Sequence, residues 1–202
     1  MHSETDRAGA VVVAGPPASG KTTLGAALAR VLHHAFIDLD IVTGTMTRAA
    51  LALAAADETA LDGEIGAQLR DARYGALLET AAAQIGVGLG VVLSGPFTRE
   101  RTDPACWDAL RERLDCPDAT LICLELDEPA RRERMRARGA VRDREKMAAP
   151  VAGDRGTPIP DAIRLDGGAR PEVVLDAALT ALDEIAGNLS RPEVEQPSPR
   201  PC

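Results

Sequence analysis

Aromatic residues are scarce in the sequence, and their scarcity limits the partners that the protein can bind. Only four occur, Phe36, Tyr74, Phe97 and Trp107, so a platform on which single-stranded bases stack has almost nothing to be built from. Positive charge is also in deficit, because 23 lysines and arginines stand against 31 aspartates and glutamates, a net charge of -8. The net charge argues against nucleic acid and anionic lipid as general partners, and together with the scarcity of aromatic residues it favours a small molecule.

Cysteine pairs and long apolar runs are missing too. The four cysteines show no CxxC spacing and no nearby histidine, which indicates neither a metal site nor a redox motif, and we interpret them as reduced thiols. At the N-terminus, the apolar stretch Ala8–Gly15 is too short for a secretion signal and runs into two prolines. We therefore expect a cytoplasmic protein.

The composition predicts one globular domain. Hydrophobic residues make up 45% and charged residues 27% of the 202 residues, an ordinary balance for a folded domain. We expect residues 9–187 to fold. Residues 1–8 are polar, and residues 188–202 carry four prolines, so we expect both ends to be disordered.

Short apolar runs alternate with helical patterns along this domain. Five runs are typical of buried strands: Ala10–Ala14, Ala35–Leu39, Gly90–Leu93, Thr120–Leu126 and Ala162–Leu165. Strands that alternate with helices predict an α/β fold with a parallel sheet covered on both faces. Residues 41–88 show no strand pattern, and we expect two or more helices there, with a break near Gly63 and Gly66, walling one side of a ligand site.

A phosphate-binding motif follows the first apolar run. Residues 15–22 read GPPASGKT and satisfy GxxxxGK[ST] between an expected strand and an expected helix. In this motif, backbone N–H groups and the helix N-terminus face a phosphate chain, Lys21 neutralises the β and γ oxygens, and the Thr22 hydroxyl reaches Mg²⁺. The expected nucleotide contacts are Gly15, Pro16, Pro17, Ala18, Ser19, Gly20, Lys21, Thr22 and Thr23.

The nucleotide is expected to be ATP. Proteins specific for guanine usually read the base with an Asn-Lys-x-Asp loop, and Asn188, the only asparagine, lies in the expected tail. ATP with Mg²⁺ is therefore the predicted cofactor.

Two carboxylates, Asp38 and Asp40, stand at the end of the second expected strand, at the edge where ligands bind. One can hold Mg²⁺ through water, and the other can accept the proton of a substrate hydroxyl that attacks the γ-phosphate. Alternatively, either residue simply caps the following helix.

The stretch from Gly15 to Asp40 resembles the opening of shikimate kinase and gluconate kinase, and the wider sequence resembles the small P-loop kinases that include chloramphenicol phosphotransferase and AAA-domain kinases. This resemblance implies a three-layer α/β/α sandwich with a five-stranded parallel sheet in the order 2-3-1-4-5. It also implies a helical substrate lobe at 41–88 and an arginine-rich lid at 134–157. By the same resemblance, Asp40 is the catalytic carboxylate, and Asp38 lies on the metal side and borders the substrate.

The sequence departs from many P-loop enzymes at the third strand. Ser94 stands where those enzymes place an acid for Mg²⁺, while Gly95 permits close backbone approach to a substrate, as in shikimate kinase. A rival acid is Asp127 or Glu128, after the fourth strand. Because Pro129 suits the first turn of a helix, we interpret these two acids as a cap and a dipole partner.

Seven arginines lie within residues 129–146. Such runs are usually solvated helix faces, which is our interpretation of Arg131, Arg132 and Arg136. The resemblance implies that others belong to a lid that folds over the phosphates: Arg138 and Arg142 as catalytic residues, with Arg134 and Arg138 on the nucleotide. Arg170 follows the fifth strand, in a turn that either borders adenine or is a plain connection.

We expect the phosphate acceptor to bind against the helical lobe. Arg70, Arg73 and Tyr74 lie one helical turn apart and can face the cleft together, or else the arginines are surface charge and Tyr74 is core. Arg99 is an alternative handle for an anionic acceptor.

These residues predict an ATP-dependent phosphotransferase that moves the γ-phosphate to a hydroxyl of a small molecule, such as a sugar acid, cyclitol, nucleoside or antibiotic. We expect a monomer or homodimer with no nucleic acid or membrane partner. Two alternatives stay open: an ATPase that uses Asp127 and Glu128, and an ATP-binding regulator without catalysis.

Overall fold

The computed structural model describes residues 9–56, 64–139 and 159–189. The first elements along the chain are β1 (Ala10–Ala14), α1 (Lys21–Leu32) and β2 (Ala35–Asp38). The helical lobe, α2 (Leu39–Leu53) and α3 (Glu64–Gly86), follows. The remaining elements are β3 (Val91–Ser94), α4 (Pro104–Leu114), β4 (Thr120–Glu125), α5 (Glu128–Arg138), β5 (Ile163–Asp166) and α7 (Pro171–Leu189).

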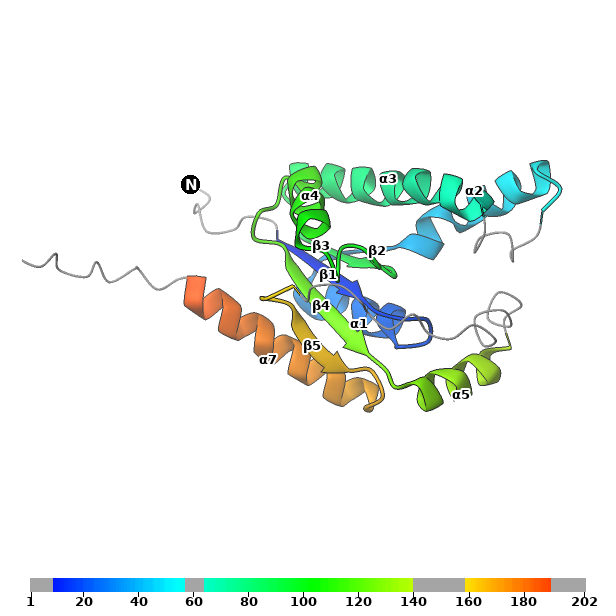
Figure 1. The fold of residues 1–202 in the computed structure, drawn as a ribbon. Helices are drawn as coiled ribbons and strands as arrows, with labels where there is room; N and C mark the ends of the chain where they lie inside the picture. The colour runs from blue at the N-terminus through cyan, green and yellow to red at the C-terminus, as the bar shows by residue number, and fades with distance from the viewer. Residues whose placement is uncertain (1–8, 57–63, 140–158, 190–202) are drawn as a thin grey trace, which may run out of the picture.

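The strands form one parallel sheet of five strands in the order β2-β3-β1-β4-β5, which confirms the expected topology (Figure 1). Each strand was recognised from its apolar run, and the first has the expected bounds. The second ends at Asp38 rather than Leu39, because Leu39 already belongs to α2. The third strand extends to Ser94 and the fifth to Asp166.

Alternate residues of the central strand build two cores, one on each face of the sheet. Val12 packs with α3 and α4 on one face, whereas Val11 and Val13 pack with α1 and α7 on the other. Figure 1 shows these helix layers above and below the sheet. The expected three-layer sandwich is therefore confirmed.

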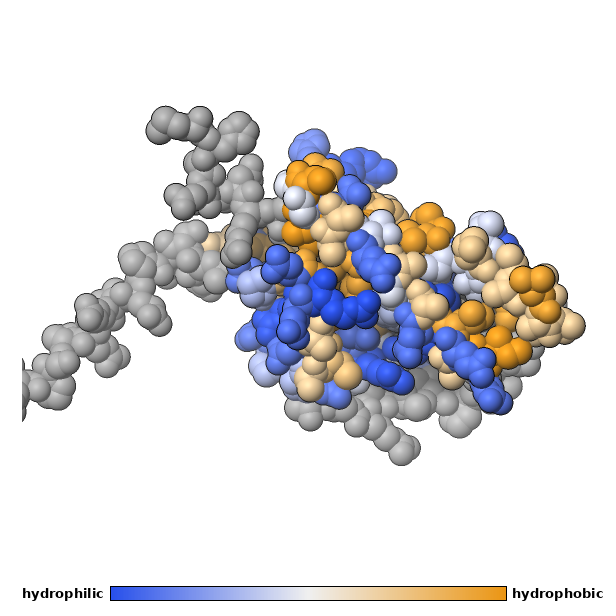
Figure 2. Space-filling model, turned by 90° about the horizontal axis from the view of Figure 1, so that it is seen from above, coloured by the Kyte–Doolittle hydropathy of each residue, from blue (hydrophilic) through white to orange (hydrophobic). Residues whose placement is uncertain are grey.

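The helical lobe leaves the sheet at the carboxyl end of β2 and consists of α2 packed on α3. The expectation of at least two helices is confirmed, but Gly66 lies inside α3, where it is buried, rather than in a break. The outer side of α2 is apolar and exposed, with Ile41, Met46 and Leu53 at 69%, 74% and 91%. Hydrophobic atoms gather at this end of the molecule in Figure 2.

The last helix, α7, continues to Leu189, two residues past the expected end of the domain. Among the helices within the described ranges, none combines the length and the apolar character that crossing a bilayer requires.

Candidate active site

The turn between β1 and α1 leaves the first backbone N–H groups of α1 without a capping side chain. Gly20 precedes α1 with φ 95°, Ala18 has φ 65°, and no side chain caps the helix. The first backbone bond of the helix runs from the Leu24 N–H to the Gly20 carbonyl, so the first-turn N–H groups have no acceptor within the helix itself. A helix start of this kind, with its positive dipole end, attracts an anion.

Close packing keeps this turn in shape. A Cβ on Gly15 would lie 2.7 Å from the Leu124 carbonyl oxygen and 2.8 Å from the Ser19 Oγ, so only glycine fits there. Ser19 is 1% exposed, and its hydroxyl has no hydrogen-bond partner among the described residues. Lys21 Nζ donates to the Pro16 carbonyl at 2.6 Å, which places the ammonium across the loop. The turn therefore has the geometry of a phosphate cradle.

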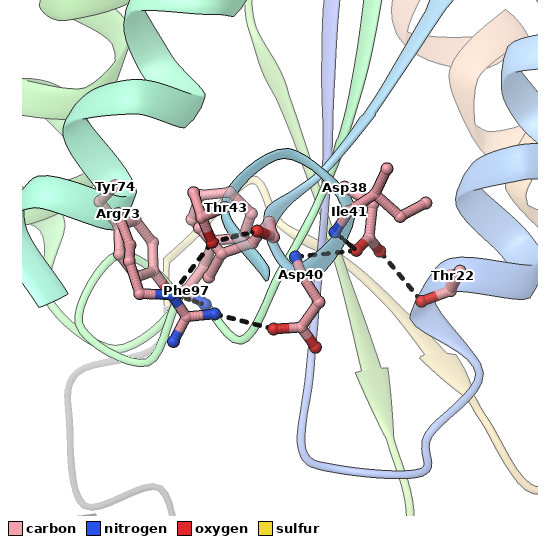
Figure 3. Close-up of polar contacts among 9 residues, drawn as sticks. Thr22, Asp38, Asp40, Ile41, Thr43, Arg73, Tyr74 and Phe97 are labelled. Carbon is pink, nitrogen blue, oxygen red and sulfur yellow. Dashed lines mark hydrogen bonds and ion pairs between the residues drawn. The ribbon is translucent and has the colours of Figure 1, made fainter. Parts of the chain in front are cut away.

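Asp38 connects this cradle to the helical lobe. Its Oδ2 accepts a 3.0 Å hydrogen bond from the Thr22 hydroxyl, and its Oδ1 caps α2 by accepting from the Asp40 and Ile41 N–H groups (Figure 3). The two interpretations of Asp38, as metal-side carboxylate and as helix cap, are therefore compatible, since each uses a different oxygen.

Asp40 lies in the first turn of α2 rather than at the end of β2, because the strand stops at Asp38. Its side chain is 52% exposed, and its Oδ1 accepts a 2.8 Å ion-paired hydrogen bond from Arg73 Nη2 of α3. Arg73 Nε donates to the Thr43 hydroxyl at 3.1 Å, and Thr43 donates to the Leu39 carbonyl. Figure 3 shows the guanidinium between the two α2 residues that it binds.

Tyr74 is buried behind this ion pair. Its hydroxyl accepts a 2.9 Å hydrogen bond from the Phe97 N–H, and the two rings meet edge to face at 5.4 Å. Burial, together with the nearby Glu100 carboxylate, raises the pKa of Tyr74 to about 12, so the hydroxyl stays protonated. Arg70 lies 4.7 Å above the Tyr74 ring and 3.9 Å from Glu100. Tyr74 thus occupies the core position that was one of its two interpretations.

The end of β3 lies between Asp38 and the phosphate cradle. Ser94 pairs in register with Asp38 on β2 and with Val13 on β1. Gly95 is buried, and a Cβ there would lie 3.2 Å from the Phe97 ring and 3.5 Å from the Leu39 side chain. At the end of β3, the groups nearest to the site are therefore the backbone of Gly95 and the hydroxyl of Ser94.

Arg134 joins the cradle to the turn after β5. Its guanidinium donates to the Gly167 carbonyl at 2.6 Å, to Gly168 at 3.2 Å and to the Ala18 carbonyl of the cradle at 3.3 Å. Gly167 is confined as well, since a Cβ would lie 2.6 Å from the Ser19 carbonyl. Arg134 therefore joins the phosphate cradle to the turn after β5, which the sequence left either as a border of adenine or as a plain connection.

The start of α5 corrects one expectation. Asp127 caps the helix through the Ala130 N–H, as predicted, and Glu128 binds Arg131 and Arg132. Arg131, however, is only 5% exposed, so it is not on a solvated face; it gives two hydrogen bonds to Glu128 and lies against Met135. Arg136 is exposed as expected. Since both acids are engaged by α5, the geometry does not favour them as the acid of an ATPase.

Several predicted residues are not drawn into these contacts. Arg142 and the Arg138 side chain lie outside the described part of the chain, although α5 ends at Arg138. Thr23, Arg99 and Arg170 are exposed. Sequence reasoning missed Thr43 and Glu100. The three-residue spacing of Asp40 and Thr43 was the available signal for Thr43, because it places both side chains on one helix face.

Magnesium, which the nucleotide motif implies, fits the side chains present. The Thr22 hydroxyl and Asp38 Oδ2 are hard oxygen ligands 3.0 Å apart, beside an uncapped helix start. Over residues 9–56, 64–139 and 159–189, no three histidine, cysteine, aspartate or glutamate side chains group into a metal site. A cation at this place would therefore have few ligands from the protein and would take the others from phosphates and water. This coordination suits Mg²⁺.

The fold and this cradle define a nucleotide-binding P-loop protein with the architecture of the small kinases. A profile of the AAA domain family matches residues 11–152, and the chain belongs to that family.

Comparisons with solved structures confirm the fold. A gluconokinase from Sinorhizobium meliloti superposes with a TM-score of 0.59 at 20% identity, over 91% of this chain and 96% of that chain. Shikimate kinase from Aquifex aeolicus superposes with a TM-score of 0.51 at 16% identity, over 90% and 99%. At these identities the likeness shows a shared fold, the one implied by the sequence resemblance.

A curated relative is similar in sequence. The tRNA dimethylallyltransferase of Anaeromyxobacter dehalogenans is 36% identical over 197 residues, which cover 86% of this chain. This chain spans 63% of that relative's length.

Proposed function

We propose that the protein is an ATP-dependent phosphotransferase that moves the γ-phosphate of ATP to a hydroxyl of a small molecule. The observation that carries the proposal is the placement of two carboxylates two residues apart. Asp38 binds the Thr22 hydroxyl of the phosphate cradle, while Asp40 is half exposed and paired with Arg73 of the helical lobe. This arrangement supports Asp38 as the carboxylate on the cation side and Asp40 as the base that takes the acceptor's proton.

Each residue has a role set by its contacts. The cradle N–H groups and Lys21 bind the β- and γ-phosphates, and Lys21 offsets the charge that spreads over the γ-oxygens during transfer. Thr22 and Asp38 would hold the cation, which would supply positive charge to offset that of the phosphates. Arg134 joins the cradle to the turn after β5. The resemblance to the small P-loop kinases implies that Arg138 and Arg142 bind the phosphates.

On the acceptor side, Asp40 accepts the proton of the hydroxyl as the oxygen bonds to the γ-phosphorus and the bond to the β-phosphate oxygen breaks. Arg73 and Thr43 keep Asp40 in place, because the guanidinium binds both side chains at once. The acceptor would pass three arginines, Arg70, Arg73 and Arg99. At Gly95, which has no side chain, the protein backbone can come close to the acceptor.

The test is ADP release from MgATP with and without a panel of sugars, sugar acids, cyclitols, nucleosides and aminoglycoside or phenicol antibiotics. Release that depends on one acceptor supports the proposal. Equal release with and without acceptors supports an ATPase, and nucleotide binding without any release supports a regulator.

The sequence likeness to tRNA dimethylallyltransferase gives a second candidate, transfer of a dimethylallyl group to tRNA. The net charge of -8 argues against a tRNA substrate. Incubation with tRNA and a labelled dimethylallyl donor tests it, and label recovered in the tRNA supports this candidate over the kinase.

A further inference from the structure

Phe97 lies in a strained turn shortly after β3. Its φ is 41°, in the left-handed region that costs free energy for a residue with a bulky side chain. The side chain is fully buried, so close packing prevents the ring from moving to relieve the backbone. Strained backbone of this kind persists only where the surrounding structure fixes it, and it gathers at functional sites. The contacts that fix Phe97 therefore bear on the site.

The hydroxyl of Tyr74 on α3 is one of these contacts. It accepts a buried 2.9 Å hydrogen bond from the Phe97 N–H, and the two rings meet edge to face (Figure 3). The Phe97 carbonyl accepts from the Arg101 N–H at 3.0 Å. Two residues before Phe97, the Gly95 N–H donates to the Val13 carbonyl of β1 at 3.2 Å. The turn is therefore anchored to the sheet at Gly95 and to the helical lobe at Phe97.

This anchored turn borders the side of the site that we assign to the acceptor. A Cβ on Gly95 would lie 3.2 Å from the Phe97 ring and 3.5 Å from the Leu39 Cβ, so the turn packs against the residue that precedes Asp40. Arg99, which is exposed, follows Phe97 by two residues. A displacement of the turn would therefore move both the Gly95 backbone and Arg99 relative to Asp40.

Consecutive residues of α3 hold the two segments in question. Arg73 binds Asp40 of α2 at 2.8 Å, and Tyr74 binds Phe97 at 2.9 Å. Tyr74 is itself confined, because it is 8% exposed and Arg70 lies 4.7 Å above its ring. A single stretch of α3 therefore sets the position of Asp40 and of the turn after β3 together.

We propose that Tyr74 is a positioning residue for phosphate transfer, whose hydroxyl holds the Phe97 N–H and so fixes the turn after β3 relative to Asp40. Tyr74 acts through Phe97 rather than by contact with the acceptor. Because the turn lies on the acceptor side, loss of the hydroxyl affects the acceptor and leaves nucleotide binding unchanged. This inference rests on the proposed function.

The first measurement is hydrogen–deuterium exchange of the full chain without ligand, for the wild type and Tyr74→Phe. Phenylalanine keeps the ring that meets Phe97 and removes only the hydroxyl. The Phe97 amide then lacks its acceptor, so we expect the amides of residues 97–102 to exchange about 10-fold faster, with no change in the cradle over residues 15–24. Unchanged exchange at residues 97–102 would overturn the proposal.

The second measurement is steady-state transfer with an acceptor that the wild type uses. A reacting group misplaced by about 1 Å costs on the order of 100-fold in rate, so a loosened turn in Tyr74→Phe should lower kcat/KM for the acceptor at least about 10-fold and leave KM for MgATP within about 2-fold.

The control is Leu114→Ala, which truncates a fully buried side chain at the end of α4 in the same core as Tyr74. The cavity should lower the unfolding temperature without changing kcat/KM, measured at a temperature where every variant is folded. An equal fall of kcat/KM in both variants, or wild-type kinetics of Tyr74→Phe, would overturn the proposal. A wild type that uses no acceptor would remove the proposed function and the catalytic role of Tyr74 with it, whereas unchanged exchange would remove the role of Tyr74 alone.

Discussion

Arg73 on α3 donates to Asp40 on α2 across a distance of 2.8 Å, although the two residues are 33 positions apart in the chain. The same guanidinium binds Thr43, so it clamps the first turn of α2 at two points. Because α2 begins directly after the carboxylate that contacts Thr22, the clamp connects the helical lobe to the phosphate cradle. The position of Asp40 therefore depends on how α2 and α3 pack.

Removing this clamp should reduce phosphate transfer without reducing nucleotide binding. Arg73→Ala removes the ion pair to Asp40 and the hydrogen bond to Thr43, so the first turn of α2 is held less firmly. A misplaced reacting group costs on the order of 100-fold in rate, so we expect kcat/KM for the acceptor to fall by about that factor. Steady-state kinetics with varied acceptor, and calorimetry with AMPPNP, measure the two quantities.

Arg73→Lys is the matched variant. Lysine keeps the charge but lacks the fork that reaches Thr43 and Asp40 together. It should recover part of the activity, and full recovery would mean that charge alone, not the two-point clamp, positions Asp40.

Arg134 should control nucleotide affinity. Its three hydrogen bonds hold the Ala18 carbonyl of the cradle and the carbonyls of Gly167 and Gly168. Hydrogen bonds to charged groups contribute about 1.5–3 kcal/mol, so Arg134→Ala should weaken AMPPNP binding at least about 10-fold. Arg136→Ala, on the exposed side of the same helix, serves as control and should bind AMPPNP as the wild type does. Equal weakening in both variants would contradict the assigned role.

The contacts of Glu128 with two arginines predict that the stability of the fold depends on pH. Hydrogen bonds from Arg131 and Arg132 lower the pKa of Glu128 from 4.5 to about 2. A carboxyl whose pKa is lower in the folded state stabilises the fold above its unfolded pKa, and this stabilisation disappears as the pH falls through the folded value. The difference in unfolding temperature between wild type and Glu128→Gln should therefore be constant above about pH 5 and shrink between pH 4.5 and pH 2. If the difference in unfolding temperature stays constant over this range, the charge of Glu128 does not contribute to stability.

Local patterns predicted the strands and the phosphate cradle because short stretches determine them. The apolar run before Gly15 and the amphipathic segment after Gly20 together place the cradle at a strand end, and the structure has it there. The Asp127 cap was predictable for the same reason, since a proline follows it within two residues.

Contacts between distant segments were not predictable in the same way. The ion pair between Arg73 and Asp40 depends on the packing of α2 against α3. The sequence pattern predicts that these helices form, but not which of their residues meet. Arg131 was assigned to a solvated face because it lies in a run of arginines, whereas its burial follows from where α5 meets the rest of the fold. A run of charges describes the average residue of a segment, so it does not show which of its members is buried.

The central claim is that Asp40 serves transfer and not nucleotide binding, and one variant tests it directly. Asp40→Asn keeps the size of the side chain and an oxygen for Arg73, but the amide cannot take up the hydroxyl proton. In the presence of MgATP and an acceptor that the wild type uses, we expect transfer to fall by at least about 100-fold while AMPPNP affinity stays within about 2-fold. Transfer at the wild-type rate by Asp40→Asn would contradict the account.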